Sequence, residues 1–126
     1  MAEFPERTVI LIVEDEPFIR MAAVDLLAAE GRVILEAGNA EEALEVIAAE
    51  ERIDLLFTDI NMPGELDGLD LAGIAYRQQP DVKLIVTSGA NKLADDEVPD
   101  HGLFISKPYS PHELTTLVAA KLGAPS

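Results

Sequence analysis

The chain has 126 residues and no cysteine, so we expect a single domain without disulfides or thiolate metal ligands. Its 9 lysine and arginine residues against 24 aspartate and glutamate residues give a formal net charge of −15, which excludes nucleic acid and anionic membranes as favoured partners. Because 48% of the residues are hydrophobic, the chain is too apolar for a disordered acidic segment. We predict one domain over residues 1–126, with its core at about 7–122, and a cytoplasmic location, since no segment resembles a signal peptide or a membrane span.

Five short apolar runs recur along the chain and predict the strands. They lie at residues 9–13, 33–35, 55–57, 82–86 and 103–105. Continuous runs rich in β-branched residues, rather than alternating ones, are typical of strands that are buried on both faces of a parallel sheet.

Helical patterns lie between these runs. The predicted helices are 18–30, ended by Gly31; a helix that follows a capping Asn39; 69–79, ended before Pro80; and a helix capped by Ser110, with Pro111 first. Between the last two strands, residues 90–102 have little apolar periodicity, so we expect at most a short helix at 91–94 and then irregular chain. Strands that alternate with helices predict a three-layer α/β sandwich with right-handed crossovers.

Polar side chains follow four of the runs. Glu14 and Asp15 follow the first, Asp59 the third, Thr87 the fourth and Lys107 the fifth. Because ligands of open α/β sheets bind at the carboxyl ends of the strands, we expect acidic side chains from two strands, a hydroxyl from a third and an ammonium from a fourth at one edge of the sheet.

Carboxylates that converge from two strands repel each other unless a cation or a proton separates them. All-oxygen ligands suit a hard cation such as Mg²⁺. A carboxylate beside Mg²⁺ can attack phosphorus to form an aspartyl phosphate, with the Lys107 ammonium and the Thr87 hydroxyl on the phosphoryl oxygens. The spacing leaves open whether the acidic pair is Glu14 with Asp15 or Asp15 with Glu16, because Glu16 also suits the start of a helix.

Five short motifs stand at these strand ends in a fixed order. They are Ile-Val-Glu-Asp-Glu at 12–16, Thr-Asp-Ile-Asn-Met-Pro at 58–63, Asp-Gly at 67–68, Val-Thr-Ser at 86–88 and Ser-Lys-Pro at 106–108. Together they resemble the CheY-like receiver domains of two-component signalling. The resemblance implies a flavodoxin-like (βα)5 fold with a parallel five-stranded sheet of order 2-1-3-4-5, here with a short or irregular fourth helix.

The resemblance also implies the roles of the acidic residues. Asp59 is the phosphoacceptor and, with Asp15, a direct ligand of Mg²⁺. Glu14 acts on the metal through water, and the backbone carbonyl of Asn61 completes the protein ligands.

The remaining site residues respond to phosphorylation. By the resemblance, Thr87 and Lys107 hold the phosphoryl group, and Phe104 is an aromatic switch whose ring turns inward as Thr87 moves. The bond between Lys107 and Pro108 is expected to be cis. The sequence departs from the family pattern in three places: a loop at 63–68 that is one residue longer, a fourth helix that is short, acidic and interrupted by Pro99, and a switch side chain without a hydroxyl.

The resemblance implies a stand-alone response regulator, not an enzyme. A sensor histidine kinase or phosphotransfer protein, docked near Phe18, Arg20 and Met21, would phosphorylate Asp59, and a monomer or weak dimer would then signal through protein contacts or act as a phosphate sink. One alternative is a small Mg²⁺-dependent phosphatase or phosphotransferase with Asp59 as nucleophile. Others are a flavodoxin-like or nucleotide-binding module and a receiver that signals without phosphorylation.

Overall fold

The computed structural model describes residues 7–28, 31–89, 98 and 102–123, and strands and helices alternate along the chain as far as residue 88. The elements are β1 (Val9–Val13), α1 (Pro17–Leu27), β2 (Val33–Ala37), α2 (Ala40–Ala49), β3 (Leu55–Asp59), α3 (Gly68–Gln78), β4 (Lys83–Ser88), β5 (Leu103–Ser106) and α4 (Pro111–Leu122). The short helix predicted at 91–94 lies outside the described residues. The label α4 therefore belongs to the predicted C-terminal helix.

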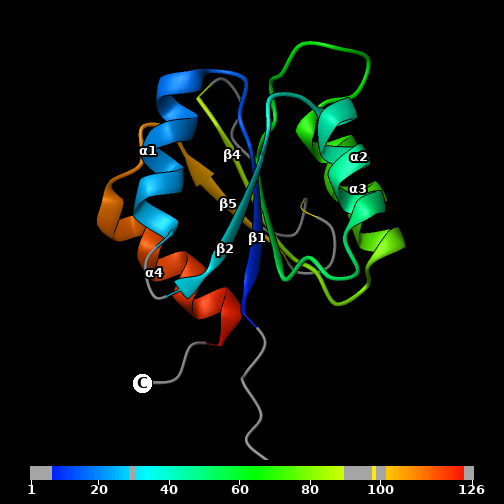
Figure 1. Ribbon diagram of the computed structural model, residues 1–126. Coiled ribbons are helices and arrows are strands. Elements are labelled where there is room, and N and C mark those ends of the chain that lie inside the picture. Colours follow the sequence, from blue (N-terminus) through cyan, green and yellow to red (C-terminus); the bar gives the residue numbers. More distant parts are fainter. Residues whose placement is uncertain (1–6, 29–30, 90–97, 99–101, 124–126) are drawn as a thin grey trace, which may run out of the picture.

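The five strands form one parallel sheet in the order β2-β1-β3-β4-β5, which confirms the predicted topology. Figure 1 shows the sheet between two helical layers, with α1 and α4 on one face and α2 and α3 on the other. Alternate residues of β1 serve the two faces: Ile10 and Ile12 pack in the core on the α1 and α4 side, and Leu11 and Val13 in the core on the other. Within the described ranges, we find no helix long and apolar enough to cross a membrane.

Four strands extend past their apolar runs. β3 continues to Asp59 and β4 to Ser88, because the polar residues still pair in the ladder, with Asp59 opposite Thr87. β2 likewise reaches Ala37 and β5 reaches Ser106. The last rungs of the sheet therefore carry the polar side chains directly, which gives them the rigidity of the strands.

The first helix is shorter than the predicted range of 18–30, because α1 ends at Leu27. The amide of Ala28 closes the last turn by donating to the carbonyl of Val24 at 2.9 Å. Gly31 has a left-handed φ of 75°, which favours glycine, but it lies beyond the last helical residue instead of capping it.

Two other helices begin at capping boxes. Asp67 and Asp70 exchange side chain to backbone hydrogen bonds at the start of α3, so this helix begins at Gly68, one residue earlier than predicted. Ser110 and Glu113 do the same at the start of α4, which confirms the predicted cap. The cap on α3 fixes the end of the loop that follows β3, next to the carboxyl edge of the sheet.

Candidate functional site

Three carboxylates meet at the carboxyl ends of β1 and β3. Glu14, Asp15 and Asp59 each offer an oxygen atom, and these atoms all lie within 4.8 Å of one another. Glu14 and Asp59 are only 4% and 5% exposed, whereas Asp15 is exposed. Since like charges this close repel one another, the cluster favours a cation, and its all-oxygen donors fit Mg²⁺.

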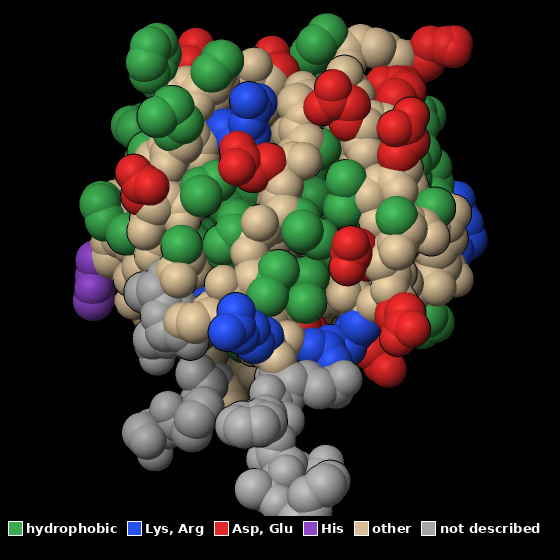
Figure 2. All heavy atoms as spheres, viewed as in Figure 1, with side chains coloured by type: hydrophobic (Ala, Val, Ile, Leu, Met, Phe, Trp, Pro, Cys, Tyr) green, Lys and Arg blue, Asp and Glu red, His purple; other side chains and the backbone are tan. Residues whose placement is uncertain are grey.

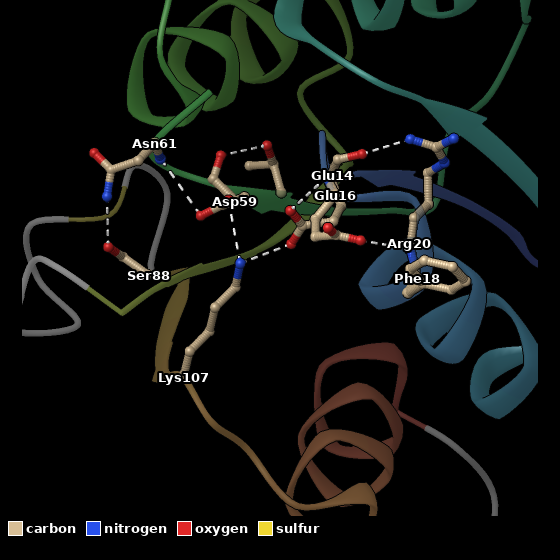
Figure 3. Close-up of polar contacts among 9 residues, drawn as sticks. Glu14, Glu16, Phe18, Arg20, Asp59, Asn61, Ser88 and Lys107 are labelled. Carbon is tan, nitrogen blue, oxygen red and sulfur yellow. Dashed lines mark hydrogen bonds and ion pairs between the residues drawn. The ribbon is translucent and has the colours of Figure 1, made fainter. Parts of the chain in front are cut away.

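The Lys107 ammonium lies between two of these carboxylates (Figure 3). Its Nζ atom is 2.8 Å from Oε1 of Glu14 and 3.2 Å from Oδ2 of Asp59. The backbone positions this lysine, because its amide donates to the carbonyl of Ser88 at 3.1 Å. The bond between Lys107 and Pro108 is cis, as expected. A positive charge from the turn after β5 thus compensates part of the negative charge at the ends of β1 and β3.

Burial in this cluster changes the acid–base balance of the ion pair. Desolvation raises the pKa of Glu14, and the charge of Asp59 adds to this, although the hydrogen bond from Lys107 opposes it. For Lys107, burial alone would lower the pKa, but the hydrogen bond to Glu14 and the charge of Asp59 outweigh it and raise the pKa. The site therefore keeps Lys107 as an ammonium and disfavours the Glu14 carboxylate.

Thr87 stands beside Asp59 on the neighbouring strand. The two residues are opposite each other in the ladder between β3 and β4. Thr87 is 1% exposed, and within the described part of the chain its Oγ1 atom has no hydrogen-bond partner. A buried hydroxyl without a partner is costly, so this atom is suited to bind an oxygen of a ligand held at Asp59.

Asn61 ties the loop after β3 to the end of β4. Its backbone N–H donates a long hydrogen bond to Oδ1 of Asp59, with 3.4 Å between the nitrogen and the oxygen. Its side-chain Nδ2 atom donates to Oγ of Ser88 at 2.8 Å (Figure 3). The second bond was not predicted, because neither side chain belongs to a periodic pattern. The role of the Asn61 carbonyl as a metal ligand stays a prediction.

The structure separates Glu16 from the three carboxylates. Glu16 is the N-cap of α1, and its side chain accepts a hydrogen bond of 2.8 Å from the amide of Phe18. Its own amide donates to Oε2 of Glu14 at 3.1 Å. The pair left open by the sequence is thus Glu14 with Asp15, and Glu16 serves the helix.

Phe104 lies on β5, which is separated by β4 from the Asp59 strand, β3. It pairs with Val86 in the ladder and is half-buried against the core on the α2 and α3 side. The next residue of β5, Ile105, is the one that pairs with Thr87, and the function of Phe104 as a switch stays a prediction.

A contact of Arg20 was not predicted from the sequence. Its Nη1 atom donates to the backbone carbonyl of Glu14 at 2.7 Å, and its Nε atom pairs with Oε1 of Glu36 at 3.2 Å. The sequence predicts only a docking role for Arg20, because no local pattern links it to Glu14 or Glu36.

An apolar surface lies beside the site at the start of α1. Phe18, Met21 and Ile19 are 79%, 57% and 36% exposed. Figure 2 shows hydrophobic side chains gathered over this end of the molecule. A cavity of about 370 Å³ runs along it, lined by Phe18, Ile19, Ala22, Lys107, Pro108 and Tyr109. The site thus opens next to a surface suited to an apolar partner.

Comparison with known proteins agrees with this geometry. Residues 10–119 match the model of the response regulator receiver domain family. The chain is 33% identical over 118 residues to the response regulator receiver protein CpdR of Brucella abortus, covering 91% of this chain and 97% of that protein. It is also 35% identical over 119 residues to the sensor kinase CckA of the same organism, covering 90% of this chain but 12% of the kinase.

A solved structure with the same fold is the CheY-like response regulator receiver domain protein from Methanospirillum hungatei. The TM-score is 0.83 at 28% sequence identity, over 94% of this chain and 95% of that one. The chain spans less than half the length of several curated relatives that it matches, such as 26% of the nitrogen assimilation regulatory protein NtrX of Azorhizobium caulinodans. The family match, which covers most of the chain, establishes that the chain belongs to the receiver domains of two-component response regulators.

Proposed function

We propose that the chain accepts a phosphoryl group on Asp59, in the presence of Mg²⁺, from a phosphohistidine of a sensor histidine kinase or a histidine phosphotransfer protein. The observation that carries the proposal is the cluster of Glu14, Asp15 and Asp59, whose oxygens lie within 4.8 Å of one another. Membership of the receiver family supports it, since this family uses such an acidic pocket for Mg²⁺.

In this proposal the carboxylates of Asp15 and Asp59 and the carbonyl of Asn61 hold Mg²⁺, and Glu14 acts through water. When bound, Mg²⁺ neutralises charge on the phosphoryl oxygens. A carboxylate oxygen of Asp59 attacks the phosphorus atom, and the P–N bond of the donor breaks, with its electron pair returning to the histidine ring. The burial of Asp59 keeps competing water away from most of its surface.

Thr87 and Lys107 bind the new phosphoryl group. Lys107 already donates to Oδ2 of Asp59 at 3.2 Å, and a short movement carries its ammonium to a phosphoryl oxygen. The Thr87 hydroxyl, which has no hydrogen-bond partner among the described residues, donates to another oxygen. We propose that this pull on Thr87 and Lys107 shifts a two-state equilibrium in which the Phe104 ring moves inward.

The phosphodonor docks on the apolar surface at the start of α1. Phe18 and Met21 offer exposed hydrophobic area, and the adjoining cavity reaches Lys107 at the site. Output follows from contacts with another protein, or the domain serves as a phosphate sink. The net charge of −15 argues against nucleic acid as the target.

The test uses acetyl phosphate as a small phosphodonor. Incubation with Mg²⁺ should add one phosphoryl group to the intact mass of the wild-type chain and none to Asp59→Asn. Chelation of the metal should prevent the gain. Repeated turnover of a small phosphomonoester would instead favour the rival phosphatase or phosphotransferase.

A further inference from the structure

The Arg20 guanidinium connects three segments that form the acidic side of the site. From α1, its Nη1 atom donates to the backbone carbonyl of Glu14 at the end of β1, over 2.7 Å. Its Nε atom pairs at 3.2 Å with Oε1 of Glu36 on β2. The arginine side chain is 24% exposed and that of Glu36 is 48% exposed, so the hydrogen bond to the backbone is the better shielded of the two contacts.

These contacts fix the backbone of Glu14 on both sides. Its amide donates to the carbonyl of Ala37 at 3.1 Å, which continues the ladder between β1 and β2. Its carbonyl is held by Arg20, as Figure 3 shows. That carbonyl belongs to the peptide unit that leads into Asp15. The orientation of this planar unit sets the direction in which the Asp15 side chain leaves the backbone.

We propose that Arg20 is a positioning residue for the cation site. It orients the peptide unit between Glu14 and Asp15 so that the Asp15 carboxylate joins the cluster, and Glu36 orients Arg20 in turn. The inference rests on the proposed function, in which these carboxylates hold Mg²⁺. Asp15 needs such support, because its side chain is exposed and lies just beyond the last residue of β1.

The sign of the effect distinguishes positioning from simple electrostatics. A guanidinium near a cation site repels Mg²⁺, so removal of its charge alone would strengthen Mg²⁺ binding. If Arg20 positions the acidic residues, its removal weakens Mg²⁺ binding instead. Outer residues that orient metal ligands typically change metal affinity by about tenfold or more when they are replaced.

The experiment measures binding of Mg²⁺ alone by isothermal titration calorimetry in four variants. Arg20→Met should raise the Kd for Mg²⁺ by about tenfold. Arg20→Lys keeps the charge but cannot make both contacts, and Glu36→Gln weakens the orientation of Arg20, so each should raise the Kd by a few-fold. The matched control is Arg77→Met, which removes the same charge from the exposed last turn of α3 and should change the Kd by less than about twofold.

A second measurement separates positioning from general destabilisation. In phosphorylation by acetyl phosphate, Arg20→Met should raise the Mg²⁺ concentration for half-maximal rate by the same factor as the Kd. The rate at saturating Mg²⁺ should stay near that of wild type. A variant that was merely less stable would lose rate at all Mg²⁺ concentrations in proportion to its unfolded fraction.

Each outcome decides between the two ideas. If Arg20→Met binds Mg²⁺ as tightly as Arg77→Met, or more tightly, or if the wild-type chain binds no Mg²⁺, the positioning role is wrong. If Mg²⁺ binding weakens as expected but no phosphoryl group reaches Asp59 in any variant, the proposed function fails and the positioning role stands. Should Arg20→Met not fold, Arg20→Lys decides by the same criterion because it keeps the charge, whereas loss of the Glu36 carboxylate would by itself weaken Mg²⁺ binding.

Discussion

The Lys107 ammonium donates a hydrogen bond of 2.8 Å to Oε1 of Glu14, and this ion pair joins the turn after β5 to the end of β1. The two residues are 93 positions apart in the chain, so only the folded sheet brings them together. Their side chains are 20% and 6% exposed. The pair places one positive charge among buried acidic groups, at the place where phosphoryl transfer would add further negative charge.

Replacement of this lysine should destabilise the protein. Lys107→Met leaves Glu14 and Asp59 buried and unpaired, and we expect the free energy of unfolding to fall by about 2–3 kcal/mol without Mg²⁺, less than for a fully buried pair. Urea unfolding measures this loss, and added Mg²⁺ should restore part of it. The control is Lys83→Met on an exposed position of β4. Equal stability of the two variants would contradict the assigned ion pair.

Lys107 should also couple phosphorylation to a structural change. Lys107→Ala removes the ammonium that would bind a phosphoryl oxygen, but it leaves the proposed metal ligands in place. We therefore expect this variant to bind Mg²⁺ while phosphorylation no longer shifts its amide NMR spectrum as it does in wild type. Phosphorylation-induced shifts identical to those of wild type would count against the assigned role.

Gly68 is required by the close approach of α3 to the end of β3. A Cβ atom at this position would lie 2.1 Å from the backbone oxygen of Asp59, and the Gly68 amide donates to the carbonyl of Ile60 at 2.9 Å. Gly68→Ala should therefore lower the free energy of unfolding by at least about 2 kcal/mol, because backbone must move. Gly73→Ala in the same helix, where the nearest atom is 3.7 Å away, should raise it by up to about 1 kcal/mol. Thermal unfolding of both variants tests the contrast, and equal losses would refute it.

Tyr109 should titrate above its ordinary pKa of 10.0. Burial raises the pKa of Tyr109, and the negative charge of Glu14 adds to the effect. The unfolded chain then loses this proton first, so stability present at neutral pH is lost as the pH rises above 10.0 through the folded-state pKa. Absorbance titration of Tyr76→Phe, in which Tyr109 is the remaining tyrosine, measures the pKa.

A second variant checks the linkage to stability. Tyr109→Phe keeps the ring, which packs edge-on against Phe57 with the two ring centroids 5.8 Å apart, but it has no phenol to ionise. Its free energy of unfolding should therefore fall less steeply above pH 10.0 than that of wild type. Identical slopes would contradict the raised pKa.

The apolar surface on α1 should bind the phosphodonor but contribute little to the stability of the fold. Phe18→Ser and Met21→Ser remove exposed side chains, so the free energy of unfolding should change by less than about 0.5 kcal/mol. Labelling by acetyl phosphate should persist, whereas transfer from a phosphorylated histidine phosphotransfer protein should slow at least about tenfold. Equal transfer rates in wild type and both variants would exclude this surface as the docking site.

Much of the site could be predicted because it sits on strand ends. A buried parallel strand has a clear sequence signal, and in such a sheet the residues that follow it share one edge. The sequence therefore predicts that Glu14, Asp15, Asp59 and Lys107 lie together. In the structure the carboxylate oxygens lie within 4.8 Å of one another, and the Lys107 ammonium lies 2.8 Å from Glu14 and 3.2 Å from Asp59.

The contacts that escaped prediction depend on side-chain reach between elements. Arg20 bonds to the backbone of Glu14, and Asn61 bonds to Ser88, without any periodic pattern that would indicate a partner. The predicted end of α1 was wrong: Gly31 is a strong stop signal in the sequence, but the helix ends earlier, at Leu27, where the amide of Ala28 closes the last turn on the carbonyl of Val24.

The most direct test of the account locates the phosphoryl group. The wild-type chain is incubated with acetyl phosphate and Mg²⁺ and reduced with borohydride, which converts an aspartyl phosphate into homoserine, and the peptides are then mapped by mass spectrometry. We predict one modified residue at Asp59, none in Asp59→Asn and none when Mg²⁺ is chelated. A phosphoryl group on another residue, or an equal gain of mass in Asp59→Asn, would contradict the central claim.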